Sequence, residues 1–146
     1  MGKVIGIATR EKTKAVMEIC KHASVLFESG IGNDSRGKKR NHRQVTVLAN
    51  ESWKATCSEM NQEMPWTTRR ANLFIEGVDL IESTGKKLKI GNFLLEITGE
   101  LEPCNRMDEQ YQGLTKVLAK DWRGGVTCKI ITEGEVHLDD EVQLVD

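Results

Sequence analysis

The feature that most constrains the fold is a series of short apolar or alternating segments, each bounded by turn-forming residues. Successive side chains of a strand point to opposite faces, so alternation with a period of two indicates a strand with one buried face. The segments that we predict as strands are 3–8, 22–28, 44–48, 72–75, 88–97, 126–130, 136–138 and 142–144. Gly91-Asn92 divides the segment 88–97 into a hairpin, and Glu133-Gly134 predicts a further turn.

Two segments instead show the spacing of a one-sided helix. The first is predicted over residues 51–64, with Asn50 as its N-cap and Pro65 as its end. The second is predicted to begin at the N-cap Asp108 and to end at Gly124-Gly125. The apolar stripes consist of Trp53, Cys57, Met60 and Met64 in the first helix and Tyr111, Leu114, Leu118 and Trp122 in the second. Together with seven or more strands, they predict a mainly β (α+β) fold, a closed or partly closed β-barrel with two or more helices at its rim.

Size and charge set the class of protein. The 146 residues suit a single domain covering 1–146, and 29% charged with 38% hydrophobic residues is typical of a globular chain. A net charge of -1 disfavours attraction of the whole molecule to nucleic acid or to an anionic membrane. No segment approaches the roughly 18 apolar residues of a membrane span, and the N-terminal apolar run is too short for a signal peptide. We therefore expect a cytoplasmic protein with neither nucleic acid nor membrane as a partner.

Four cysteines lie far apart without a C-x-x-C pair, which disfavours a zinc knuckle or a dithiol redox motif. The three histidines have no metal-ligand spacing, so a structural metal site is not expected. Cys57 and Cys128 fall on apolar positions of a predicted helix and strand and are interpreted as buried small hydrophobic residues. Cys20 fits either environment.

Cys104 differs from the other three because it follows Pro103 and precedes a predicted helix by a few residues, which predicts a loop. A thiol reacts as its thiolate, which a helix N-terminus or a cation such as Arg106 favours. Four nearby carboxylates act in the opposite direction; they are Glu100, Glu102, Asp108 and Glu109. From these residues alone, Cys104 is either a reactive thiol or an incidental loop cysteine.

Two arginine-rich segments are candidate anion sites. The segment SRGKKRNHRQ, residues 35–44, crowds basic side chains around the turn-prone Gly32 and Gly37, so it is either an anion-binding loop or a solvated basic loop. Its basic residues are Arg36, Lys38, Lys39, Arg40 and Arg43. In TTRRANLFIEG, residues 67–77, Arg69 and Arg70 precede a strand, so that one can point into a barrel mouth while the other meets solvent, or both can flank an edge strand.

Five segments, taken in order along nearly the whole chain, resemble the MOSC domain, a module found at the C-terminus of eukaryotic molybdenum cofactor sulfurases and as stand-alone bacterial proteins. They are GIGNDSRG (30–37), RQVTVLANESW (43–53), RRANLFIEGVDL (69–80), GKKLKIGNFLLEITGELEPCNRMDE (85–109) and GLTKVLAKDWRGGVTCKIITEGEV (113–136). This chain resembles the stand-alone bacterial type, because it has no room for the pyridoxal-phosphate desulfurase domain of the sulfurases.

The resemblance implies a barrel-like fold that binds the molybdenum cofactor (molybdopterin), with no pyridoxal phosphate on this chain. It implies that Cys104 carries sulfur as a persulfide or ligates molybdenum. The residues that it assigns to holding the cofactor are Arg36, Arg70, Asn72, Arg106 and Arg123. For Arg106 and Arg123, a role in stabilising the fold is an equal alternative.

The resulting hypothesis is a sulfur carrier with sulfurtransferase-type activity. Its sulfur would come from a cysteine desulfurase and pass to a molybdoenzyme or to a protein of cofactor biosynthesis. Two alternatives stay open: a cofactor-binding or insertion chaperone in which Cys104 only ligates the metal, and a molybdenum-dependent reductase of N-hydroxylated compounds.

Overall fold

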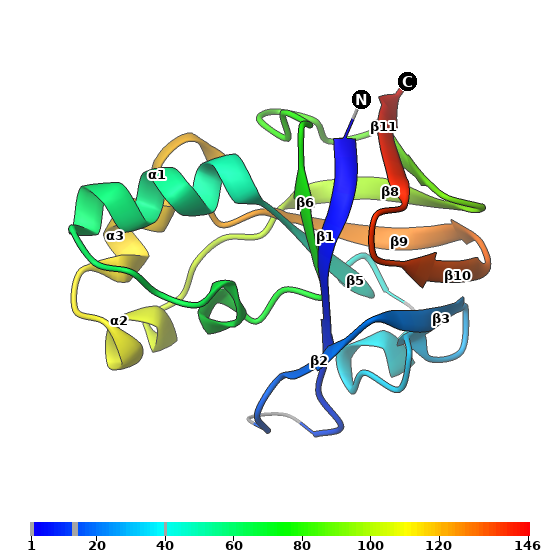
Figure 1. Ribbon diagram of the computed structural model, residues 1–146, viewed down its shortest axis with the longest axis horizontal. Coiled ribbons are helices and arrows are strands. Elements are labelled where there is room, and N and C mark those ends of the chain that lie inside the picture. Colours follow the sequence, from blue (N-terminus) through cyan, green and yellow to red (C-terminus); the bar gives the residue numbers. More distant parts are fainter. Residues whose placement is uncertain (1, 13–14, 40) are drawn as a thin grey trace.

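The computed structural model describes residues 2–12, 15–39 and 41–146, and Arg40 of the predicted basic loop lies outside these ranges. The chain order of its elements can be followed by colour in Figure 1. The strands are β1 Gly2–Thr9, β2 Glu18–Cys20, β3 His22–Leu26, β4 Gly30–Ile31, β5 Val45–Ala49, β6 Leu73–Glu76, β7 Lys87–Ile90, β8 Phe93–Glu100, β9 Val126–Thr132, β10 Gly134–His137 and β11 Glu141–Val145. The helices are α1 Asn50–Met60, α2 Arg106–Gln110 and α3 Leu114–Leu118, with 3-10 turns η1 Arg36–Lys38, η2 Trp66–Arg69 and η3 Lys120–Trp122.

The main sheet closes into a barrel of seven strands in the order β11-β7-β8-β9-β5-β6-β1, because β1 pairs back onto β11. The short β2 extends this sheet from the far end of β1. The predicted mainly β barrel is confirmed. Figure 1 shows the three α-helices gathered at one side of the barrel, and the two chain ends close together where β1 meets β11.

Among the described strands, one pair is parallel, β5 with β6, and its connection brings the helices to the barrel. A parallel pair needs a crossover, which α1 and η2 supply. Both faces of these strands are covered: Val47 and Leu73 point into the barrel core, while Leu48 and Phe74 pack in a second cluster beneath the helices. This double burial explains the nearly continuous apolar runs VTVLA and LFIE.

The predicted helices are correct in place and wrong in their ends. Asn50 is the first residue of α1 and not its N-cap. α1 ends at Met60, because the C-cap Asn61 has a left-handed φ of 50° that stops the helix before Pro65. The second predicted helix is broken in two by Gly113, at φ 91°. Asp108 lies inside α2 but still caps a helix, because its Oδ1 accepts the N–H of Thr115 in the first turn of α3 at 2.8 Å.

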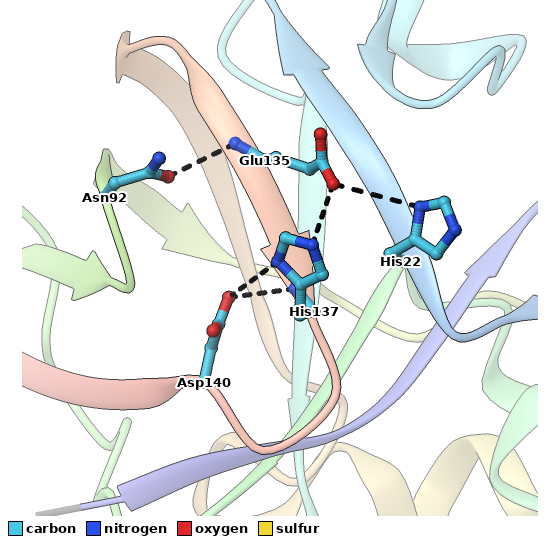
Figure 2. A network of polar contacts seen from close by, with 5 residues as sticks. All are labelled: His22, Asn92, Glu135, His137 and Asp140. Atoms are coloured by element: carbon cyan, nitrogen blue, oxygen red, sulfur yellow. Dashed lines mark hydrogen bonds and ion pairs between the residues drawn. The ribbon is translucent and has the colours of Figure 1, made fainter.

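A smaller sheet, in the order β10-β3-β4, lies beside the barrel and carries the network of polar side chains in Figure 2. Register places His22 opposite His137, and their rings stack with centroids 5.9 Å apart. Oε1 of Glu135 lies 2.8 Å from His137 Nε2, and Asp140 accepts the backbone N–H of His137 at 2.8 Å. The strand β2, which precedes this sheet, was not predicted; Ile19 at its centre is 70% exposed, so an apolar pattern does not mark it.

Candidate site of an exposed cysteine and an arginine cluster

Cys104 lies in the loop between β8 and α2, with an exposed side chain and a fixed backbone. Its carbonyl oxygen accepts the N–H of Met107 at 3.0 Å and the hydroxyl of Thr115 at 2.8 Å. The second bond comes from α3, so the loop is tied to a neighbouring element as well as to the helix it starts. The thiol is therefore accessible at a position held by its own main chain.

Arg36 is held in the glycine-rich loop by contacts from both of its ends. Its backbone N–H donates to Asp34 Oδ2 at 3.1 Å, and its Nη1 donates to Thr46 Oγ1 at 3.0 Å. A β-carbon on the adjacent Gly37 would stand 2.3 Å from the carbonyl oxygen of Ser29, so only glycine fits this turn. Burial, together with repulsion from neighbouring arginines, lowers the pKa of Arg36 to about 10, and the side chain stays charged at neutral pH.

Arg36 belongs to a group of guanidiniums that repel one another. Burial and then Arg70 lower the pKa of Arg10, and Arg106 adds to this effect. Asp34 partly offsets the repulsion, and its Oδ1 accepts the backbone N–H of Arg10 at 2.8 Å. We call this group the arginine cluster; it comprises Arg10, Arg36, Arg43, Arg70 and Arg106. In the described part of the chain, no carboxylate forms an ion pair with any of them.

The neighbouring Arg69 and Arg70 diverge. Arg70 has a left-handed φ of 64° at the end of η2, and its half-buried side chain donates from Nη1 to the Ala15 carbonyl at 3.1 Å. Arg69 is only 6% exposed. Arg70 thus belongs to the cluster, whereas Arg69 is buried within the protein, where Arg36 and Arg43 also repel it.

Asn72 is 1% exposed, and its polar atoms bond within the fold. Its Oδ1 accepts the N–H of Thr46 at 3.1 Å, and its Nδ2 donates to the Ala8 carbonyl at 3.2 Å. Thr46 in turn accepts from Arg36, so Asn72 supports the cluster through a buried threonine. Its assignment as a direct cofactor ligand stays a prediction, and these contacts give it a structural role.

Arg123 has other partners than the cluster. Its Nη1 lies 2.8 Å from Glu59 Oε1, and Lys120 pairs with the other oxygen of the same carboxylate. These hydrogen bonds lower the pKa of Glu59. Arg123 also lines a cavity of about 360 Å³ beside the start of α1, together with Asp79 and Asp121. The geometry gives Arg123 an ion pair with Glu59, and its assignment to the cofactor stays a prediction.

Comparison with known proteins identifies the fold family. The model of the MOSC domain matches residues 34–143. The chain belongs to the MOSC domain family. This family is associated with molybdenum cofactor binding.

Solved structures share the MOSC fold of this chain at low sequence identity. The YuaD protein from Bacillus subtilis superposes with a TM-score of 0.82 at 18% identity, over 99% of this chain and 96% of that one. YiiM from Escherichia coli superposes with a TM-score of 0.74 at 14% identity, over 99% of this chain and 70% of that one. For YiiM from Geobacillus stearothermophilus the TM-score is 0.70 at 13% identity, over 99% of this chain and 73% of that one. A comparison with curated proteins found no match.

The other cysteines of this MOSC chain are less accessible than Cys104. Cys128 is fully buried among the barrel strands, and burial strongly raises the pKa of its thiol. Cys57 and Cys20 are half-buried. Cys57, which was predicted to be buried, packs at the edge of the apolar cluster beneath the helices. Among the described residues, no group of three or more His, Cys, Asp or Glu side chains could hold a metal ion, and no helix is long and apolar enough to cross a membrane.

Sequence reasoning missed several residues that the MOSC fold brings to the site. Arg10 stands at the end of the first strand, and no motif marks it. The sequence places Asp34 in a glycine-rich loop and Thr46 in a strand. Only their contacts in the structure reveal that Asp34 bonds to Arg10 and Thr46 to Arg36. Arg69 was named without a role, and burial is what distinguishes it.

Proposed function

We propose that this MOSC protein binds the molybdenum cofactor, or a precursor of it, at the arginine cluster and carries sulfur on Cys104. The observation that supports the proposal is an exposed thiol on a fixed loop, two residues before Arg106 of an arginine cluster that no described carboxylate pairs. Guanidinium groups recognise phosphate through paired N–H donors, and a thiolate is a soft ligand suited to molybdenum chemistry. The donor set therefore fits an anionic, phosphate-bearing molybdenum cofactor.

Arg10, Arg36 and Arg70 would hold the phosphate. Hydrogen bonds to Thr46 and Ala15 already restrict the guanidiniums of Arg36 and Arg70, and the backbone N–H of Arg10 is fixed by Asp34. Arg106, which is exposed beside Cys104 in the sequence, would contact the bound molecule nearer to the thiol. When bound, the cofactor would supply a molybdenum centre that accepts or retains sulfur.

The loading of sulfur needs only Cys104 and a donor. The thiolate of Cys104 attacks the outer sulfur of a persulfide on a cysteine desulfurase. A new sulfur–sulfur bond forms at Cys104 while the sulfur–sulfur bond of the donor breaks, and the donor leaves as a thiolate with the electron pair. No oxidant or reductant enters this exchange. The acceptor in the cell would be a molybdoenzyme or a protein of cofactor biosynthesis.

The test is intact-mass analysis after incubation with a cysteine desulfurase and cysteine, followed by peptide mapping of the added sulfur. We expect one added sulfur atom on Cys104, none in Cys104→Ser, and wild-type loading in Cys57→Ser, a matched control at a half-buried thiol. Equal loading of wild type and Cys104→Ser would refute the carrier function. Cofactor binding without any added sulfur would instead favour the binding or insertion protein, and binding is expected to weaken in Arg70→Ala.

A further inference from the structure

Arg69 connects both ends of the segment that carries Cys104. Its Nη2 donates to the carbonyl of Leu101 at 2.7 Å, and its Nε donates to the carbonyl of Gly124 at 2.9 Å. Leu101 precedes the Cys104 loop and Gly124 follows η3. One planar side chain therefore ties together the two ends of the segment 101–124. The backbone adds one more link, from the N–H of Leu101 to the carbonyl of Gly125 at 2.8 Å.

The space around this guanidinium is tightly filled. A β-carbon on Gly124 would come within 3.0 Å of Nη2 and 2.6 Å of the Leu101 carbonyl oxygen. Among the described residues, the third nitrogen, Nη1, contacts the thioether sulfur of Met107 at 4.0 Å, a weak acceptor. Two of the five N–H groups of Arg69 thus make strong hydrogen bonds, and both acceptors are neutral carbonyl groups.

Arg69 carries its positive charge in a buried position. Within the described residues, no carboxylate lies at ion-pair distance from it. Its pKa is lowered to about 10, chiefly by burial, and it still carries its charge at neutral pH. Its contacts with Leu101 and Met107 place the guanidinium against the residues three before and three after Cys104.

A clamp on two carbonyl groups needs N–H donors but no charge. Because an uncompensated buried charge is costly, a side chain that only tied the loop would be as well served by a neutral donor. The positive charge of Arg69 becomes favourable if the side chain that it faces is anionic. A thiolate at Cys104 is such a group, and so is a persulfide.

We infer that Arg69 is a positioning residue, which fixes the Cys104 loop through its fork of hydrogen bonds and presents a permanent positive charge to a sulfur anion at Cys104. This inference rests on the proposed function only in naming the persulfide as the loaded form. The charge acts in the same way on the unloaded thiolate. Arg69 is not expected to contact the cofactor, because it is buried under the loop.

The experiment compares alkylation of Cys104 by anionic iodoacetate and by neutral iodoacetamide, with the rate at this residue read by peptide mass spectrometry. The ratio of the two rates reports the local charge, whereas a change in loop geometry or access alters both rates together. Arg69→Gln should lower the ratio of iodoacetate to iodoacetamide about threefold or more. Arg69→Lys should retain the ratio, because it retains the charge, and should change both rates because it loses the fork.

The control is Lys129→Gln, which removes the same charge from an exposed site where Lys129 pairs with Glu96 at 3.2 Å. It should leave both rates as in wild type. An unchanged ratio in Arg69→Gln would overturn the charge assignment. If Arg69→Gln does not fold, wild-type rates with both reagents in Arg69→Lys would overturn the clamp. Neither reagent needs a sulfur donor or cofactor, so failure of the sulfur-loading test and failure of this one are separate results.

Discussion

Replacing Thr46 by valine is expected to destabilise the protein by about 2 kcal/mol, although the two side chains have nearly the same shape. The hydroxyl of Thr46 is fully buried and accepts from Arg36 Nη1 at 3.0 Å. It also meets Asn72, with Oγ1 3.1 Å from the backbone nitrogen and 3.3 Å from Oδ1.

The magnitude follows from which partners lose their bonds. The backbone N–H of Asn72 keeps the Thr46 carbonyl at 3.0 Å, and Asn72 Oδ1 keeps the Thr46 N–H at 3.1 Å, so Asn72 stays bonded in the variant. Arg36 loses the acceptor of its Nη1, and hydrogen bonds to a charged group contribute about 1.5 to 3 kcal/mol. The expected loss is therefore in the lower half of that range.

Equilibrium unfolding in urea, followed by tryptophan fluorescence, measures this difference. Its midpoint should fall while the slope stays constant, because the surface exposed on unfolding is unchanged. Thr56→Val is the matched control. Thr56 is equally buried, but its hydroxyl bonds only to the Ser52 carbonyl one helical turn earlier, at 2.9 Å, so a loss below about 0.5 kcal/mol is expected. If Thr46→Val were as stable as wild type, or no less stable than Thr56→Val, the assignment of Arg36 to this hydroxyl would be wrong.

Three further outcomes are expected. Burial and Glu102 raise the pKa of Glu100, so this group favours the folded state most at low pH, and its contribution is lost as the pH rises through its folded pKa. Relative to wild type, Glu100→Gln should therefore be more stable at pH 7 than at pH 4 in thermal unfolding scans. An equal stability difference at both pH values would contradict this. Gly125 has φ 97°, and Gly125→Ala would place a β-carbon 2.3 Å from a backbone oxygen, so its free energy of unfolding in urea should fall by about 3 kcal/mol or more. For Gly85→Ala, where φ is 90° but no atom lies within 4 Å of the added carbon, the expected fall is about 1 to 2 kcal/mol. In the native protein, iodoacetamide should modify Cys104 while Cys128 becomes labelled only on unfolding, as peptide mapping at increasing urea would test; early labelling of Cys128 would contradict its burial.

The strands could be predicted because the barrel imposes a simple pattern on them. Each of the predicted segments forms a strand within a few residues of its expected ends, and the turn at Gly91-Asn92 joins β7 to β8. The break in the second helix could not be predicted. Leu114 and Leu118 keep helical spacing with Tyr111 across Gly113, and it is the tertiary position of α3 against α1 that requires the chain to turn there.

The candidate site was predictable in its parts and not in its assembly. Pro103 and the coming helix were enough to place Cys104 in an exposed loop. The contribution of Arg10 could not be predicted, because its proximity to Arg70 depends on the antiparallel pairing of β1 with β6. Asn72 illustrates the reverse difficulty: a polar side chain in an arginine-rich motif suggests a ligand contact, yet three-dimensional packing commits its amide to neighbouring strands.

Closing the barrel by pairing Gly2 and Lys3 with Val142 and Glu141 also sets a condition on synthesis at the ribosome. The strand β1 is synthesised well before its partner β11, which begins at Glu141. Until then β1 and β7 each have a side that lacks its β11 partner, and such open edges favour pairing between nascent chains. A barrel in which β11 has not yet docked is therefore the folding stage at which edge-to-edge pairing with another chain is most favoured.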